Sequence, residues 1–195
     1  MKLWNLLKND FQRAVFSFTF LLTSVGIAIL ISSSGYAMIS QCDSVIHYMQ
    51  FGMRGNGLET VISTILPLLP FALSFSFEWN EKAVPFYLIR SGPQQYILSK
   101  LIISAVSGFL VLVLGIFLSI PIIKIIAPQL PFVAENIQLT DFFDIFLING
   151  YPALGYGVYM VDYALSGCLT AVCAVWFSTY IPNPFAALAA PMAIY

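Results

Sequence analysis

The chain alternates between long apolar runs without charged residues and shorter segments in which the charges gather. A helix of about 20 residues crosses the roughly 30 Å of hydrocarbon in a bilayer. The runs that meet this requirement predict four complete spans, over about 14–34, 60–77, 100–123 and 158–180. A last run, 185–195, has 11 residues and begins a fifth span. Because 11 helical residues reach only about 16 Å, we expect the natural chain to continue past Tyr195.

Pro67 and Pro70 interrupt the second of these runs. A proline inside a helix removes a backbone hydrogen bond, and in a membrane protein neighbouring groups satisfy the freed carbonyl. We therefore expect the span over 60–77 to bend. The connection over 36–59 is predicted to be a loop, and the sequence DFFDIFLI at 141–148 predicts a short amphipathic helix on the membrane surface.

Residues 1–13, MKLWNLLKNDFQR, have the pattern of an amphipathic helix. Leu3, Leu7 and Phe11 fall on one face, which is typical of a helix anchored in the membrane interface. An equally good interpretation is a cytoplasmic overhang of the first span. The segment is not followed by a small-residue cleavage site, so it does not predict a secretory signal.

Composition agrees with the pattern. Hydrophobic residues make up 59% of the chain and charged residues 9%, whereas soluble proteins carry roughly a quarter charged residues. We therefore expect an all-α, polytopic membrane protein in which 1–195 form a single transmembrane domain. Lys and Arg are scattered singly, so no basic patch predicts nucleic acid as a partner.

The basic residues also predict an orientation. With a cytoplasmic N-terminus, two of the eight, Arg54 and Lys124, lie on the outer side. This distribution obeys the positive-inside rule, and we expect the N-terminus in the cytoplasm. The basic residues on the cytoplasmic side are then Lys2, Lys8, Arg13, Lys82, Arg90 and Lys100.

Recognisable catalytic and cofactor motifs are absent from the sequence. No GxxxxGK[ST] element is present, so the chain itself is not expected to hold or hydrolyse ATP. The predicted spans carry almost no ionisable residues, so a channel, an ion-coupled carrier or a membrane enzyme has little support from the sequence. His47 is the only histidine, and the cysteines have no metal-ligand spacing. We therefore expect no catalytic residues, no metal and no cofactor in this chain.

The segment 77–100, FEWNEKAVPFYLIRSGPQQYILSK, separates the second and third runs and holds five of the seventeen charged side chains. Pro85 can begin a short helix, Gly92 can end it, and Pro93 can begin the next. This predicts a cytoplasmic elbow over 78–93 that exposes aromatic and aliphatic side chains beside Arg90. Aromatic residues and Arg dominate the energetics of interfaces, which favours a protein partner. The alternative is that these apolar residues rest on lipid headgroups.

The elbow resembles the first cytoplasmic loop of the permease subunits of ABC-2-type transporters. That loop has a glutamate-rich start, a short coupling helix, a turn and a lysine that opens span three; here it reads Glu78, Glu81 and FYLIRSGPQQYILSK. The sequence STYIPNPFAALAAP, 178–191, looks like the family's join between spans four and five. The frequent Glu-x-Gly-Thr element is absent, with Lys82-Ala83-Val84 where Gly-Thr would stand.

The resemblance implies a multi-pass subunit of the bacterial cell membrane, usually with six spans. Two such subunits, identical or different, would pair. Each would dock its elbow on a separate ATP-binding cassette ATPase subunit, which would hold ATP and Mg²⁺. ATP-driven closure of the ATPase subunits would then export a substrate. No residue of this chain indicates which substrate is exported or which ATPase is the partner. The alternative function is that of a non-transporting membrane scaffold or sensor.

The resemblance also assigns roles to residues of this chain. The docking residues would be Glu78, Glu81, Phe86, Tyr87, Arg90 and Pro93. Leu3, Leu7 and Phe11 would anchor the interfacial helix.

Overall fold

The computed structural model describes residues 2–36, 39–53, 58–134 and 141–193. Within these residues every regular element is helical. Three helices are long and apolar enough to cross a membrane: α2 (Phe18–Tyr36), α7 (Pro93–Ile126) and α9 (Pro152–Tyr180). They coincide with the first, third and fourth expected spans. The prediction of an all-helical chain with several helices long and apolar enough to span a membrane is therefore confirmed for the described residues.

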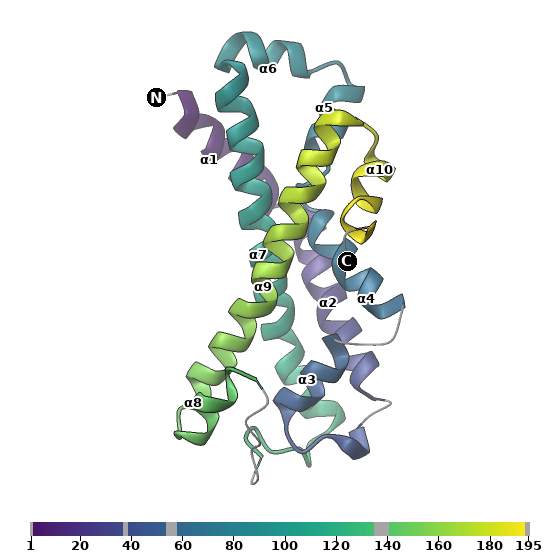
Figure 1. The fold of residues 1–195 in the computed structure, drawn as a ribbon, viewed down its shortest axis with the longest axis vertical. Helices are drawn as coiled ribbons and strands as arrows, with labels where there is room; N and C mark the ends of the chain where they lie inside the picture. The colour runs from purple at the N-terminus through teal and green to yellow at the C-terminus, as the bar shows by residue number, and fades with distance from the viewer. Residues whose placement is uncertain (1, 37–38, 54–57, 135–140, 194–195) are drawn as a thin grey trace.

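Helix α7 is the central element, and both α2 and α9 pack along it (Figure 1). Its 34 residues give a length of about 51 Å at 1.5 Å per residue, well beyond the hydrocarbon thickness. The helix begins at Pro93, before the expected start of the span near 100. Its first two turns therefore project beyond the apolar part of the helix.

Glycines allow α7 to approach its neighbours closely. A Cβ atom added to Gly108 of α7 would lie 2.6 Å from the carbonyl oxygen of Gly167 in α9. A Cβ added to Gly115 would lie 2.7 Å from Cγ2 of Ile27 in α2. Small residues at helix contacts are a common means of association in membranes, where van der Waals packing replaces the hydrophobic effect. The close packing of α2, α7 and α9 thus depends on glycines, which have no side chain, as well as on the side chains that fill the contacts.

The segment 60–77 differs from the expected single bent helix. It comprises most of α4 (Leu58–Ile65), a 3-10 turn η2 (Leu66–Leu68), further turns, and the start of α5 (Ser74–Asn80). Pro67 and Pro70 lack the amide hydrogen that a continuous helix requires. Two prolines three residues apart therefore break the helix rather than bend it. No span-length helix covers this segment of the described chain.

The expected loop over 36–59 contains a buried helix, α3 (Val45–Met53), preceded by a 3-10 turn η1 (Ile39–Gln41). Tyr48 and Met49 are fully buried, and the Tyr48 hydroxyl donates to the Ser32 carbonyl oxygen of α2 at 2.5 Å. A Cβ on Gly35 would overlap the Tyr48 ring. The expectation of a loop was wrong because the burial of this nine-residue helix depends on its contact with α2 at Gly35, which the local sequence pattern does not show.

Several shorter helices lie toward the two ends of the molecule (Figure 1). At one end lie α1 (Lys2–Val15), α5 and α6 (Val84–Ser91), and at the other lie α3 and α8 (Asp144–Ile148). Helix α8 covers part of the predicted 141–148 helix. After α9, the Asn183 side chain accepts a hydrogen bond from the amide of Phe185 at 3.0 Å and caps α10 (Pro184–Ala189), which is followed by η3 (Pro191–Ala193).

A pair of alanine substitutions tests the close contact between α7 and α9. We expect Gly108→Ala to lower the free energy of unfolding by about 1–3 kcal/mol, because the new methyl meets a backbone oxygen that cannot move freely. Gly157→Ala is the control: the added Cβ has no neighbour within 4 Å, and alanine favours a helix by up to about 1 kcal/mol. Unfolding in detergent measures both, and equal effects would contradict the contact.

Candidate functional site

Three charged side chains from distant parts of the sequence are buried together where α1, α5 and α7 meet. Asp10 of α1 is 6% exposed, Glu78 of α5 8% and Lys100 of α7 2%. The Nζ atom of Lys100 lies 2.7 Å from Oε1 of Glu78 and 3.5 Å from Oδ1 of Asp10. A buried ion is costly unless it is paired and hydrogen-bonded. The lysine therefore binds both carboxylates and holds α1 and α5 against α7.

Further groups satisfy the two carboxylates. The Tyr96 hydroxyl donates to Oε2 of Glu78 at 2.5 Å, and the Ser99 hydroxyl donates to Oδ2 of Asp10 at 2.8 Å. Arg13 Nη1 lies 3.5 Å from Oε1 of Glu78, although the arginine side chain is 61% exposed. We call this set the Lys100 cluster; its members are Asp10, Arg13, Glu78, Tyr96, Ser99 and Lys100.

Helical spacing explains why these side chains converge. Residues three and four apart share a face of a helix, and Tyr96, Ser99 and Lys100 have this spacing on α7. On α1, Asp10 falls in the same stripe as Leu7 and Ala14. Sequence analysis did not assign Asp10, Tyr96 or Ser99 to a site. The available signal was the single acidic residue inside the apolar stripe of α1.

The elbow expected over 78–93 contains the short helix α6. Gly92 ends it with a φ of 87° and ψ of 149°, a conformation that favours glycine, and α7 begins at the next residue. The Tyr87 ring stacks on the Tyr96 ring, with centroids 5.8 Å apart and planes at 16°. Because Tyr96 also donates to Glu78, α6 is connected directly to the Lys100 cluster.

The residues predicted to dock a partner fall into different environments. Phe86 is 76% exposed, and Glu81 and Pro93 are also exposed. Ile89, an aliphatic side chain of the same helix, is 86% exposed. Glu78, in contrast, is held inside by Lys100 and Tyr96. Its role in docking stays a prediction, and its contacts are those of a structural group.

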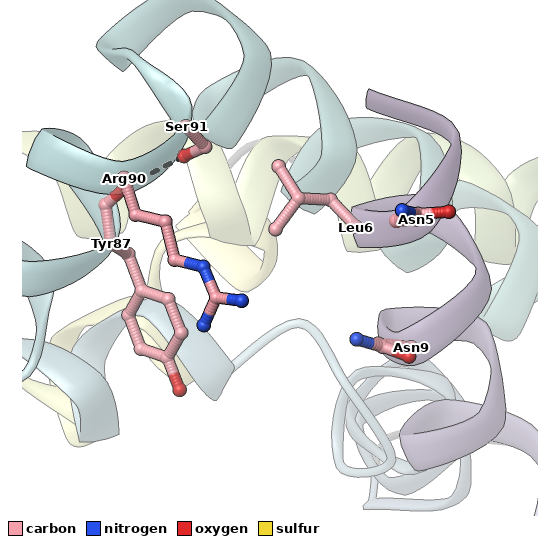
Figure 2. Close-up of a pocket in the computed structure, with 6 residues that line it drawn as sticks. All are labelled: Asn5, Leu6, Asn9, Tyr87, Arg90 and Ser91. Atoms are coloured by element: carbon pink, nitrogen blue, oxygen red, sulfur yellow. Dashed lines mark hydrogen bonds between the residues drawn. The ribbon is translucent and has the colours of Figure 1, made fainter. Parts of the chain in front are cut away.

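Tyr87 and Arg90 line a cavity of about 250 Å³ between α6 and α1. Figure 2 shows the Arg90 guanidinium directed toward α1 and the Asn9 amide directed toward α6. The cavity is lined by Asn5, Leu6, Asn9, Tyr87, Arg90 and Ser91. Both predicted docking residues therefore face the N-terminal helix, and contact of either with a partner remains a prediction.

The predicted interfacial anchors make contacts within the protein. Leu7 and Phe11 pack against the buried side chains of Phe71 and Ile103, and Leu3 is half-buried. Trp4 is 72% exposed on another side of α1. The N-terminal segment thus forms an amphipathic helix as expected, and the apolar face of this helix packs on the rest of the chain.

The contacts of the Lys100 cluster join three helices. The described residues contain no group of three or more His, Cys, Asp or Glu side chains able to hold a metal ion. The buried lysine binds two carboxylates, one on α1 and one on α5, so its contacts are not confined to a single pair of helices. Movement of α6 would act through Tyr96 on three helices at once.

Comparison with known proteins gives no match to a family model, a curated protein or a solved structure. The function must therefore be argued from the geometry of the elbow and the Lys100 cluster.

Removal of the central charge tests the cluster. We expect Lys100→Met to lower the free energy of unfolding by about 3–5 kcal/mol, because two buried carboxylates lose their cation. Lys8→Met, at an exposed position of α1, should change it by no more than about 0.5 kcal/mol. Thermal or denaturant unfolding in detergent measures the difference. Similar losses in the two variants would show that the cluster does not hold the helices together.

Proposed function

We propose that the chain is the membrane-spanning permease subunit of an ABC-2-like ATP-driven exporter, coupled to a separate ATP-binding subunit through the elbow. One observation carries the proposal: a helix with exposed apolar side chains, α6, stands at the end of the long helices, and the stacked Tyr87 and Tyr96 rings connect it to the buried ion pairs of Lys100. The resemblance of the elbow sequence to ABC-2 permeases supports the same conclusion.

The outer face of α6 has the properties of a docking surface. Phe86 and Ile89 are three residues apart, so they share one face of the helix, and both are largely exposed. Large exposed apolar side chains beside a charge often mark a protein contact. Glu81 precedes the helix and is exposed, which places a charge near the apolar patch, whereas Arg90 is directed toward α1 (Figure 2).

The Lys100 cluster gives this surface a mechanical connection. A partner that closes on ATP would displace α6, and α6 would carry Tyr96 with it through the Tyr87 stack. Tyr96 is bonded to Glu78, and Glu78 to Lys100. Because separating buried ion pairs is costly, α1, α5 and α7 would move together with α6 rather than lose these contacts. Such a movement can open a path for substrate between paired permease subunits.

The proposed orientation places α1 and α6 in the cytoplasm. Lys8, Arg13, Lys82 and Arg90 lie on these elements or next to them, whereas Lys124 lies near the far end of α7. This agrees with the positive-inside rule. The path through α3, α4 and α5 would make a discontinuous crossing beside α2, α7 and α9. The protein would then cross a bacterial cell membrane four times up to Tyr180.

Cysteine labelling tests this topology. In a variant without the native cysteines, Glu81→Cys should resist a membrane-impermeant maleimide applied to intact cells, and Asn149→Cys should react. Both positions are exposed at opposite ends of the molecule. Labelling of Glu81→Cys should appear once the membrane is permeabilised. Reaction of Glu81→Cys in intact cells would reverse the proposed orientation.

Docking is tested by purifying the tagged protein from its native membrane in mild detergent. We expect a soluble subunit with a Walker A motif to accompany the wild-type protein, as identified by mass spectrometry. Phe86→Asp places a charge in the proposed contact and should reduce recovery about tenfold or more, as expected for a residue at the centre of an interface. Phe142→Asp, at an exposed aromatic position at the far end, should leave recovery unchanged.

Two outcomes would contradict the proposal. Absence of an ATPase under conditions that keep a known transporter intact would favour the alternative function, a membrane scaffold or sensor. Equal recovery with Phe86→Asp and Phe142→Asp would show that the ATPase binds elsewhere than at α6.

A further inference from the structure

We propose that the cavity between α1 and α6 binds the phosphate group of an anionic phospholipid of the cytoplasmic leaflet. The site is distinct from the outer face of α6, and its occupation does not require a partner ATPase. The residues that would contact the phosphate are Asn5, Asn9, Tyr87 and Arg90.

The polar groups of this cavity have no partner in the part of the chain that the structure describes. The Arg90 guanidinium, the Tyr87 hydroxyl and the amides of Asn5 and Asn9 make no hydrogen bond or ion pair with any described residue. The buried charged residues nearby, Asp10, Glu78 and Lys100, are already paired within the Lys100 cluster. The cavity therefore presents a permanent positive charge and several donors that the protein itself does not satisfy.

The donors indicate the chemistry of the ligand. Guanidinium, carboxamide and phenol groups all supply N–H or O–H donors, and Arg90 and Asn9 face one another across the gap (Figure 2). Donors on two sides of a space can be bridged by one acceptor between them. No acidic side chain lines the cavity. A phosphate, with acceptor oxygens directed to several sides, fits donors from two helices better than the two oxygens of a carboxylate.

The depth of the cavity favours a lipid as the source of the phosphate. Asp10 is bonded to Ser99 and Lys100, so the neighbouring Asn9 lies near the level at which the apolar part of α7 begins. Helix α7 starts at Pro93, about 10 Å along the helix axis from the level of Ser99 and Lys100. Arg90 comes just before Pro93 in the sequence. The headgroup layer occupies about 5–8 Å on each side of the hydrocarbon. The cavity thus lies at the level of lipid phosphates.

Lipid binding to the purified protein provides the test. Native mass spectrometry in about 0.2 M ammonium acetate, where long-range attraction is screened, would count bound dioleoylphosphatidylglycerol. Dioleoylglycerol, which has the same acyl chains without the phosphate, serves as the comparison lipid. We expect the phospholipid to bind and the diacylglycerol to bind at least about tenfold more weakly, the ratio expected for lost charge-assisted hydrogen bonds.

Variants connect that binding to the cavity. Arg90→Gln should weaken phospholipid binding about tenfold, and Asn9→Leu should weaken it by filling the space while leaving every charge in place. Lys8→Gln removes an equal charge from α1 at a position outside the cavity and should change binding by no more than about twofold under this screening. Unfolding temperatures of the lipid-free variants would confirm that they fold.

Three results would overturn the proposal. Equal losses with Arg90→Gln and Lys8→Gln would indicate a general attraction of the basic end for anionic lipid. Displacement of the phospholipid by millimolar inorganic phosphate would identify free phosphate as the ligand of the cavity. Full binding by Asn9→Leu would place the lipid elsewhere. None of these results depends on recovery of an ATPase, so failure of this inference is distinguishable from failure of the proposed function.

Discussion

The arrangement at the α1 end of the molecule depends on one buried cation. Lys100 is 2% exposed, and an ammonium group at such a site is tolerated only with anions beside it. Asp10 is ninety residues away in sequence and Glu78 twenty-two. The requirement to neutralise Lys100 therefore selects where α1 and α5 meet α7. The stacked Tyr87 and Tyr96 rings extend this constraint to α6.

The middle of the molecule is held in a different way. There α7 contacts α2 and α9 through glycines, with backbone approaching backbone or side chain directly. These contacts have no charge to satisfy, and their strength comes from close packing. Beside them the path through α3, α4 and α5 is broken by Pro67 and Pro70. The structure thus combines three closely packed long helices with a discontinuous helical path, and the two parts are joined at the Lys100 cluster.

The sequence predicted the features that depend on local pattern. Uninterrupted apolar runs are sufficient to locate α2, α7 and α9, and Pro85 and Gly92 delimit α6. It did not predict α3, because burial of a nine-residue helix depends on the groove that Gly35 opens in α2. It also did not predict the Lys100 cluster. Pairing between Asp10 and Lys100 is set by tertiary contact, and a charge next to an apolar run resembles an ordinary loop residue.

The two faces of α6 connect the proposed docking surface with the proposed lipid site. Phe86 and Ile89 lie on the outer face, whereas Tyr87 and Ser91 face α1, with Arg90 between them. A ligand held between α6 and α1 would favour one position of α6. If a partner also prefers that position, each ligand must strengthen binding of the other by the same factor. A partner that requires a different position of α6 would be opposed by the lipid to the same degree. Lipid composition would then set how readily the elbow engages its partner.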